Sequence, residues 1–287
     1  MVREIVQFLL GNLVFFFMLV AGLEIDLRDV RQFWRRPGTV ALCARALLIV
    51  FVGLPILALS IVSIIPMPLP LKGLILLIAI CPGKLFILKN LRKAEANIPL
   101  AVNVTSLVVL ASPFLVPIWV SVTGRIHTVD MSLSSFSVLD LTLRKVLVPF
   151  AAGVLLRHLA PQWARSMSHF VDRVASVALL LAIALILILG VPNLGQLVPG
   201  GLAAIFTITA GGILMGLGAG GPRPDEQNAV MQATVPGDPT LVLAIVAQNF
   251  PEARIQALLA ACIVARTFML IPLQRWVKAG LSHSRTG

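Results

Sequence analysis

Long, uninterrupted apolar runs are the feature that most constrains how this chain can fold. A helix that crosses the hydrocarbon core of a bilayer needs about 20 mostly apolar residues. The runs are rich in Leu, Val, Ile and Ala, and the short segments between them carry Pro, Gly and charge. Because the apolar residues are continuous rather than alternating, we predict helices and not strands. The nine predicted spans are 5–23, 39–63, 71–90, 97–120, 139–157, 173–191, 201–220, 229–248 and 254–277.

The composition excludes a soluble enzyme, a disordered chain and a disulfide scaffold. Of the 287 residues, 58% are hydrophobic and 12% are charged, whereas a soluble domain has about 45–50% apolar and about 25% charged residues. The cysteines Cys43, Cys81 and Cys262 lie inside apolar runs, without the spacing of a zinc or disulfide motif. The predicted fold class is an all-α polytopic membrane protein.

The basic residues are placed as in a membrane protein rather than as in a nucleic-acid-binding protein. The formal net charge is +11, but Lys and Arg are grouped in the short segments between the runs. Cytoplasmic loops of membrane proteins carry an excess of Lys and Arg. Most of these residues, including the groups at 28–36 and 89–93, fall on one side if the segment after the first run is cytoplasmic. We therefore predict a cell-membrane protein with its N-terminus outside, its C-terminus in the cytoplasm and no nucleic-acid partner.

Two of the predicted spans contain helix-breaking residues. The third carries Cys-Pro-Gly-Lys at 81–84, and the eighth carries Val-Pro-Gly-Asp-Pro at 235–239. Proline removes a backbone donor and clashes with the preceding turn, so we expect both helices to unwind there. Interrupted spans in matching positions of two halves are typical of the binding site of a secondary transporter.

The positions of these breaks favour two inverted repeats within one transmembrane transporter domain that covers 1–287. The last five spans form a unit whose fourth helix is broken, and the first four spans fit the same unit without its first helix. Repeat one would cover 1–121 and repeat two 138–280, with opposite orientations in the membrane. Prolines are also frequent in membrane helices in general, so two unrelated kinks are the alternative.

Four motifs follow one another along the chain. They are residues 21–27 with a proline at 37, Cys81-Pro82-Gly83 followed by Asn97 and Leu100, the stretch 105–117 with its Ser-Pro pair, and Asp225-Glu226-Gln227 through Leu241. In this order and spacing they resemble the bile acid–sodium symporter family over nearly the whole chain, minus one N-terminal helix of the ten-helix members. The resemblance implies a panel domain and a core domain, with the two broken helices crossing at the ion and substrate sites, here at 81–89 and 233–240.

Carried over by this resemblance, the sodium ligands of the family are mostly replaced. Its Ser-Asn pair falls on Ile87 and Leu88, its next serine on Ala101, its shared glutamate on Ala233, its second-span glutamine on Val50, and its Gln-Asn pair on Gly237 and Asp238. Only the threonine is kept, as Thr105. Sodium needs hard oxygen ligands, which aliphatic side chains do not offer. We therefore expect no bound cofactor, and a proton, or no ion, in place of sodium as the coupling ion. Sodium held by backbone carbonyls at the break and by Thr105 is the alternative.

Charged residues stand at the predicted breaks instead. Lys84 follows the Cys-Pro-Gly motif directly, Lys89 is five residues further on, and Asp238 is the one acid well inside a predicted span. Charges at membrane depth usually pair or line a polar path. Our hypothesis is that Lys84 and Asp238 meet at the crossover, where the ammonium group takes the place of a sodium ion. The pair would be either proton-switched, since a desolvated lysine has a lowered pKa, or a permanent structural salt bridge.

Other polar and small residues within the spans each have two interpretations. Arg45 and Arg266 could clamp a carboxylate of the substrate, or they could snorkel and bond backbone carbonyls. The glycines at 212, 216 and 220 form a GxxxG-type face, which favours close helix packing, with a hinge as the alternative. The histidines show no metal-ligand clustering, and no metal site is predicted.

The broken spans predict a secondary transporter, and the resemblance to the bile acid–sodium symporter family implies that it moves a small organic anion across the bilayer by alternating access. No HExxH motif, Walker loop, dinucleotide fingerprint or nucleophile elbow is present, so we predict that the chain is not an enzyme. One alternative is a receptor or scaffold descended from a transporter. Another is an arsenite-type exporter, favoured only by Cys81. The sequence leaves the cargo, the direction of transport and the oligomeric state open.

Overall fold

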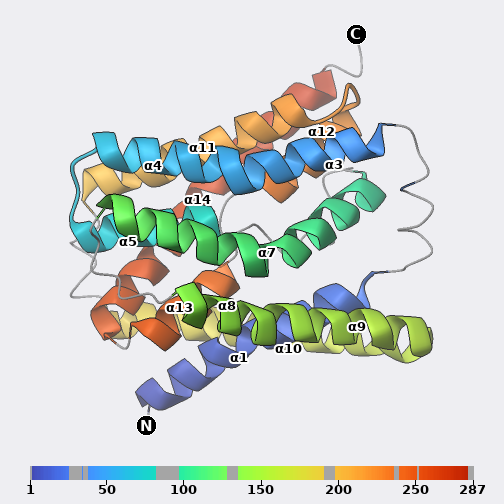
Figure 1. Cartoon of the computed structure of the whole chain (residues 1–287), viewed down its shortest axis with the longest axis horizontal. Helices are drawn as coiled ribbons and strands as arrows, with labels where there is room; N and C mark the ends of the chain where they lie inside the picture. Colours follow the sequence, from blue (N-terminus) through green and yellow to red (C-terminus); the bar gives the residue numbers. More distant parts are fainter. Residues whose placement is uncertain are drawn as a thin grey trace.

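A computed structural model describes residues 2–25, 34, 38–81, 97–127, 135–190, 198–235, 239–250 and 252–283. Within these ranges all regular structure is helical and no strand occurs, which confirms the all-α prediction (Figure 1). Four helical stretches among the described residues are long and apolar enough to cross a membrane, namely Thr39–Ile64, Ile98–Gly124, Pro199–Ala219 and Arg254–Gln274.

Twelve α-helices and two short π-helical segments build this part of the chain. Each π-segment precedes a proline, Pro55 or Pro149, whose missing N–H disturbs the regular bonding of the helix. The elements are α1 (Val2–Leu23), α3 (Thr39–Leu48), η1 (Ile49–Gly53), α4 (Leu54–Ile64), α5 (Leu69–Ile80), α7 (Ile98–His127), α8 (Ser135–Thr142), η2 (Leu143–Leu147), α9 (Val148–Leu159), α10 (Pro161–Gly190), α11 (Pro199–Ala219), α12 (Pro224–Thr234), α13 (Pro239–Asn249) and α14 (Ala253–His283).

The helix that contains the sixth predicted span begins much earlier than the span. The apolar run starts at 173, but α10 begins at Pro161. Proline suits the first turn of a helix because its missing N–H would have no partner there. Residues 161–172 are helical but rich in polar side chains, so a criterion based on apolar length does not detect them.

The predicted break in the eighth span is present in the structure. The span is divided into α12, which ends at Thr234, and α13, which starts at Pro239. The third span corresponds to α5, which ends at Ile80 just before the predicted break, with Cys81 already in an extended conformation. Residues 82–96 and 236–238 lie outside the described part of the chain.

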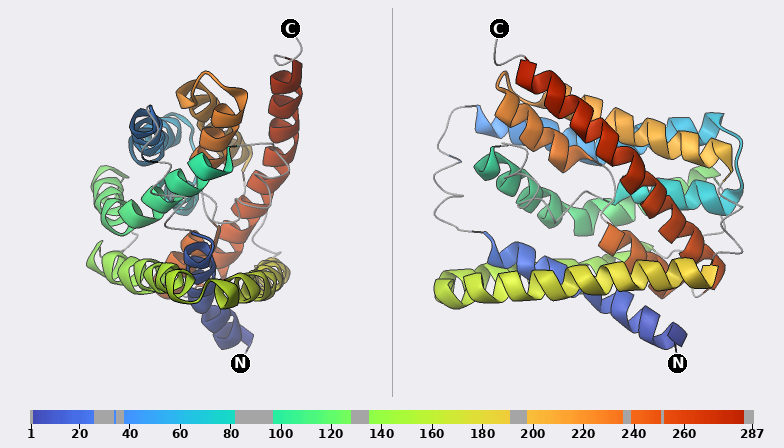
Figure 2. Two further views of the ribbon diagram at one scale, coloured as in Figure 1. Left: turned by 90° about the vertical axis from the view of Figure 1, so that its right-hand side faces the viewer. Right: turned by 180° about the vertical axis from the view of Figure 1, so that it is seen from behind.

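The helices form two groups that lie side by side (Figures 1 and 2). One group contains α1, α8, α9 and α10, with α1 packed against α9 and α10. The other contains α3, α4, α5, α7, α11 and α12, with α11 packed against α12 and α4. The long helix α14 runs diagonally across the bundle and contacts both α10 and α11 (Figure 2, right). The carboxyl-terminal helix therefore connects the two groups.

Glycines bring α11 and α12 into close contact. A Cβ atom on Gly216 would overlap the Thr234 hydroxyl and the Met231 backbone. The Thr234 hydroxyl donates a hydrogen bond to the carbonyl oxygen of Gly212 at 3.1 Å. The close-packing interpretation of the glycine face is therefore confirmed.

A second pair of glycines joins α1 to α9. A Cβ atom on Gly22 would overlap the carbonyl oxygen of Phe150, and one on Gly153 would overlap the carbonyl oxygen of Leu19. Each glycine Cα also lies 3.0 Å or less from the Cβ position of the other. The two backbones thus touch, and no side-chain rotation can relieve an added methyl group.

We predict that Gly153→Ala destabilises the protein by about 1–3 kcal/mol, the usual cost of overpacking. The thermal unfolding midpoint of the detergent-purified chain measures this effect. Gly218→Ala is the matched control, because Gly218 is also helical and has no atom within 4 Å of its Cβ position. The control should be neutral or slightly stabilising, since alanine favours the helix. Equal midpoints for Gly153→Ala and the wild type would contradict the backbone contact.

Candidate functional site

Three of the positions carried over from sodium ligands come together in the structure. Val50 lies in η1, Ala101 in α7 and Ala233 in α12. Their exposed fractions are 1%, 0% and 4%, and all three belong to one buried cluster. Its other members are also apolar, namely Cys43, Ala46, Phe51, Leu100, Val104, Val108, Ala229 and Val230. The structure therefore places these three positions in one buried cluster of apolar character.

This cluster, which we call the apolar crossover cluster, has few groups that could replace the water ligands of a cation. Hard cations bind through carboxylate, carbonyl, amide and hydroxyl oxygens. The aliphatic side chains of Val50, Ala101 and Ala233 provide none. Burying an ion without such ligands is strongly unfavourable. Among the described side chains, a sodium shell cannot be assembled from these three positions.

The hydroxyl of Thr105 is a polar exception next to the cluster. Threonines within helices usually bond the carbonyl one turn back, as Thr209 does with Ile205 at 2.7 Å. The Thr105 hydroxyl oxygen is buried and has no hydrogen-bond partner among the described residues. Such orphaned polar atoms are rare in native structures. Because Thr105 follows Val104 of the cluster in the chain, this hydroxyl without a described partner lies next to the apolar crossover cluster.

The remaining residues predicted at the breaks lie outside the described part of the chain. They are Lys84, Ile87, Leu88, Lys89, Gly237 and Asp238. The pairing of Lys84 with Asp238 accordingly stays a prediction. The ends of α5 and α12 show only that both segments leave the helical conformation at Cys81 and Val235.

A hydrogen bond between helices supports the η1 segment beside Val50. Pro55 has no N–H to donate to the carbonyl of Phe51, the acceptor four residues back. The indole Nε1 of Trp119, on α7, donates to that carbonyl at 2.6 Å. Trp119 therefore takes the role of the missing backbone donor and ties α7 to the proline-disturbed helix.

Arg266 lies on α14 and is buried, with an exposed fraction of 3%.

Farther along the same helix, the Gln274 amide donates to the Oε1 atom of Gln232 at 3.2 Å. Gln232 precedes Ala233 of the apolar crossover cluster. These two glutamines could not be predicted from the sequence, because isolated glutamines carry no motif.

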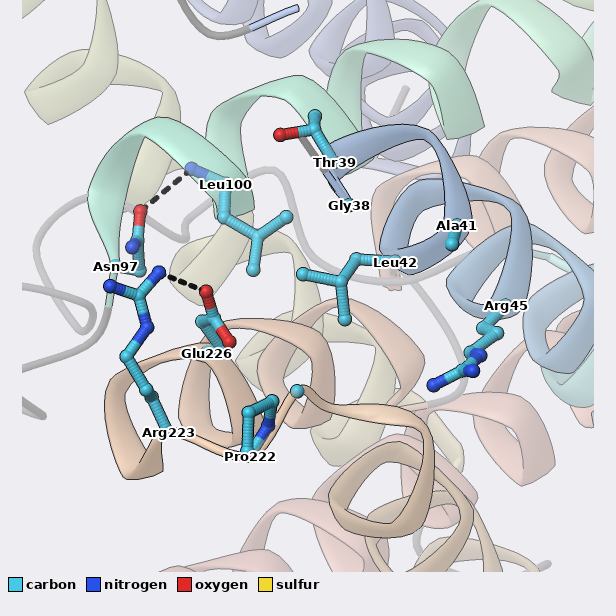
Figure 3. A pocket seen from close by; sticks show the side chains of 11 residues that line it. Gly38, Thr39, Ala41, Leu42, Arg45, Asn97, Leu100, Pro222, Arg223 and Glu226 are labelled. Atoms are coloured by element: carbon cyan, nitrogen blue, oxygen red, sulfur yellow. Dashed lines mark hydrogen bonds and ion pairs between the residues drawn. The ribbon is translucent and has the colours of Figure 1, made fainter. Parts of the chain in front are cut away.

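Arg45 lies elsewhere, at a pocket with a volume of about 420 Å³ (Figure 3). The side chain of Arg45 is exposed and enters the pocket from α3. The pocket is lined by Gly38, Thr39, Ala41, Leu42, Arg45, Asn97, Leu100, Gly221, Pro222, Arg223 and Glu226. Arg266 is not among the lining residues of this pocket.

A buried carboxylate holds Arg223 at this pocket. Glu226 forms a hydrogen-bonded ion pair with the guanidinium of Arg223. The side chain of Glu226 is only 9% exposed, whereas that of Arg223 is 64% exposed. The hydrogen bond and the charge of Glu226 raise the pKa of Arg223, so this residue stays cationic.

The first residues of α7 and α12 are bonded to each other beside the pocket. The backbone N–H of Asn97 donates to the Asp225 carbonyl at 3.0 Å. The Asn97 amide donates to the Asp225 carboxylate at 3.1 Å and its oxygen accepts from the N–H of Leu100, also at 3.1 Å. Asn97 is thus the N-cap of α7 and a link to α12.

These features define the class of the protein: an all-helical integral membrane protein with an interrupted helix of the kind found in secondary transporters. The model of the sodium bile acid symporter family matches residues 12–197, more than half of the chain, and the chain belongs to this family. Members of the family are transporters rather than enzymes. No curated protein matches the chain.

We predict that Trp119→Phe destabilises the protein by about 1–3 kcal/mol, because it leaves the buried Phe51 carbonyl without a partner. Thermal unfolding of the purified chain measures the loss. Trp163→Phe is the control and should be neutral, since Trp163 is 78% exposed. In the Pro55→Ala background, the backbone regains a donor and Trp119→Phe should cost less. An equal loss in both backgrounds would contradict this role of Trp119.

Proposed function

We propose that the chain is a secondary transporter that moves a small organic anion by alternating access without using sodium. The transporter class follows from membership of the sodium bile acid symporter family. The proposal of sodium independence is carried by one observation, which is that Val50, Ala101 and Ala233 converge in the apolar crossover cluster. A carrier of this family that does not use sodium would have such a cluster, in which the positions of the sodium ligands are kept but their oxygen atoms are lost.

The proposed architecture has nine spans in two inverted repeats, with an outside N-terminus and a cytoplasmic C-terminus. The division of the eighth span into α12 and α13 and the end of α5 at Ile80 support broken helices in matching positions. The two groups of helices support a panel and a core that move relative to each other. The glycine contacts within each group support their movement as rigid units.

In the proposed mechanism, fixed charges of the protein take over the role of the sodium ions. Lys84 and Asp238 would lie at the helix crossover, and protonation of this pair would couple anion movement to a proton gradient. Thr105 supports a polar path beside the apolar crossover cluster, because its buried hydroxyl has no partner among the described residues. Uniport of the anion is the simpler version of the same proposal.

Flux into proteoliposomes tests the proposal. A bile acid, pantothenate and a 2-oxo acid serve as labelled cargo, with sodium and proton gradients imposed separately. We expect saturable uptake that sodium does not stimulate, because the apolar crossover cluster has no ligands for it. Stimulation by sodium would contradict sodium independence, and an absence of flux with every cargo would contradict transport of these three anions and favour the receptor alternative.

Charge exchange at the crossover tests the coupling pair. We predict that Lys84→Met and Asp238→Asn each lower proton-driven uptake about 10-fold or more, because each leaves one charge at membrane depth without its partner. The exchange Lys84→Asp with Asp238→Lys should restore part of the loss. Lys72→Met, at the start of α5, is the control and should keep wild-type uptake. Wild-type folding and uptake by Asp238→Asn would contradict the pairing of Lys84 with Asp238.

A further inference from the structure

We propose that the pocket between the first turns of α3, α7 and α12 binds an organic anion through Arg45 and Arg223. The pocket shares Leu100 with the apolar crossover cluster, but Arg45 and Arg223 do not belong to that cluster. Glu226, its one lining residue on α12, lies in the first turn of that helix, about 12 Å along the axis from Thr234. The proposal therefore concerns binding at a second place and does not rest on transport.

Two guanidinium groups from different helices line the pocket. Arg45 projects from α3, and Arg223 stands directly before α12, on the opposite side of the pocket in Figure 3. Glu226 is the one carboxylate among the lining residues, so one positive charge is in excess there. Guanidinium groups bind carboxylates and phosphates with geometrically matched pairs of hydrogen bonds.

The two arginines differ in what they bind within the protein. Arg45 forms no hydrogen bond or ion pair with another described residue. Arg223 is held by Glu226, whose second carboxylate oxygen lies so close to Gly221 that a Cβ atom there would overlap it. Glu226 is thus fixed, and it occupies only part of a guanidinium group that has five donors. Arg45 is free to bind a ligand, and Arg223 is positioned for one.

The backbone adds to the positive potential of the pocket. Three helices begin at its wall, at Thr39, Ile98 and Pro224. The N-caps of α3 and α12, Gly38 and Arg223, provide no side-chain hydrogen bond to the first turns. Helix N-termini favour anions, although here they only reinforce the two arginines. The acid next to the pocket, Asp225, is bonded to Asn97 and does not line the cavity.

The remaining lining favours an organic anion over a bare ion. Leu42, Leu100 and Pro222 give the pocket an apolar wall between the two arginines (Figure 3). A volume of about 420 Å³ accommodates a small molecule with an aliphatic part as well as an acidic group. We infer a ligand with a carboxylate or phosphate group on a short apolar body. In the proposed orientation, the pocket faces the cytoplasm, where such a group comes either from a metabolite or from an anionic lipid.

Ligand-dependent stabilisation of the full chain tests this site. Inorganic phosphate and succinate are titrated against the protein in phosphatidylcholine nanodiscs, and a separate arm uses nanodiscs that contain phosphatidylglycerol. The shift of the unfolding midpoint with concentration gives a Kd. We expect stabilisation in at least one arm. Saturation by succinate or phosphate identifies a soluble ligand, whereas stabilisation only by phosphatidylglycerol identifies a lipid headgroup, and both results support the anion site.

Arginine variants decide whether this pocket is the place of binding. Arg45→Gln should weaken binding about 10-fold or more, since it removes a charged hydrogen-bond donor. Its fold should stay intact, because Arg45 bonds no described residue. Arg223→Gln should weaken binding further, and Arg173→Gln, an exposed arginine on α10, should not change the Kd. Equal Kd values for Arg45→Gln and Arg173→Gln, or no stabilisation in any arm, would overturn the proposal, whatever the flux measurements show.

Discussion

Backbone groups that lose their helical partners at membrane depth must find new ones inside the protein, and this constraint shapes the bundle. There is no water in the hydrocarbon core to satisfy them. The carbonyl of Phe51 shows how the chain responds, because the proline that removes its donor is compensated by the indole of Trp119 on another helix. One local defect thus fixes the distance between α7 and the helix formed by α3, η1 and α4. The end of α12 at Thr234 creates the same need for new hydrogen-bond partners at the proposed crossover.

Close backbone contacts make each half of the bundle stiff, and this determines which motions are available. Gly22 and Gly153 bring α1 and α9 together, and Gly216 brings α11 against α12. Glycine contacts between helices leave little room for sliding, since the backbones interlock without flexible side chains between them. Relative movement is then easier between the groups than within them. The diagonal helix α14, which contacts both groups, is the natural place for such movement to be transmitted.

Much of the fold could be predicted from the sequence, because apolar length and proline are strong local signals. They indicated the helices, the break before Pro239 and the packing of the glycine face. The early start of α10 at Pro161 could not be predicted in this way, since its first turns are polar. The pocket was also missed. Its elements meet through the contact of Asn97 with Asp225, far apart in the chain. Although these residues and Glu226 belong to motifs of the sequence, neither this contact nor the burial of Glu226 has a local signal.

The proposed independence from sodium changes the energetics of an anion carrier. Each elementary charge that crosses a membrane potential of about 100 mV carries about 2.3 kcal/mol. A symporter that carries sodium neutralises its anionic cargo with the ion, so the potential does not oppose uptake. An anion carrier that does not use sodium would either take up a proton with each anion or let the negative-inside potential drive the anion outward. Protonation of a lysine–aspartate pair would meet the first requirement, and a carrier without it would act as an exporter.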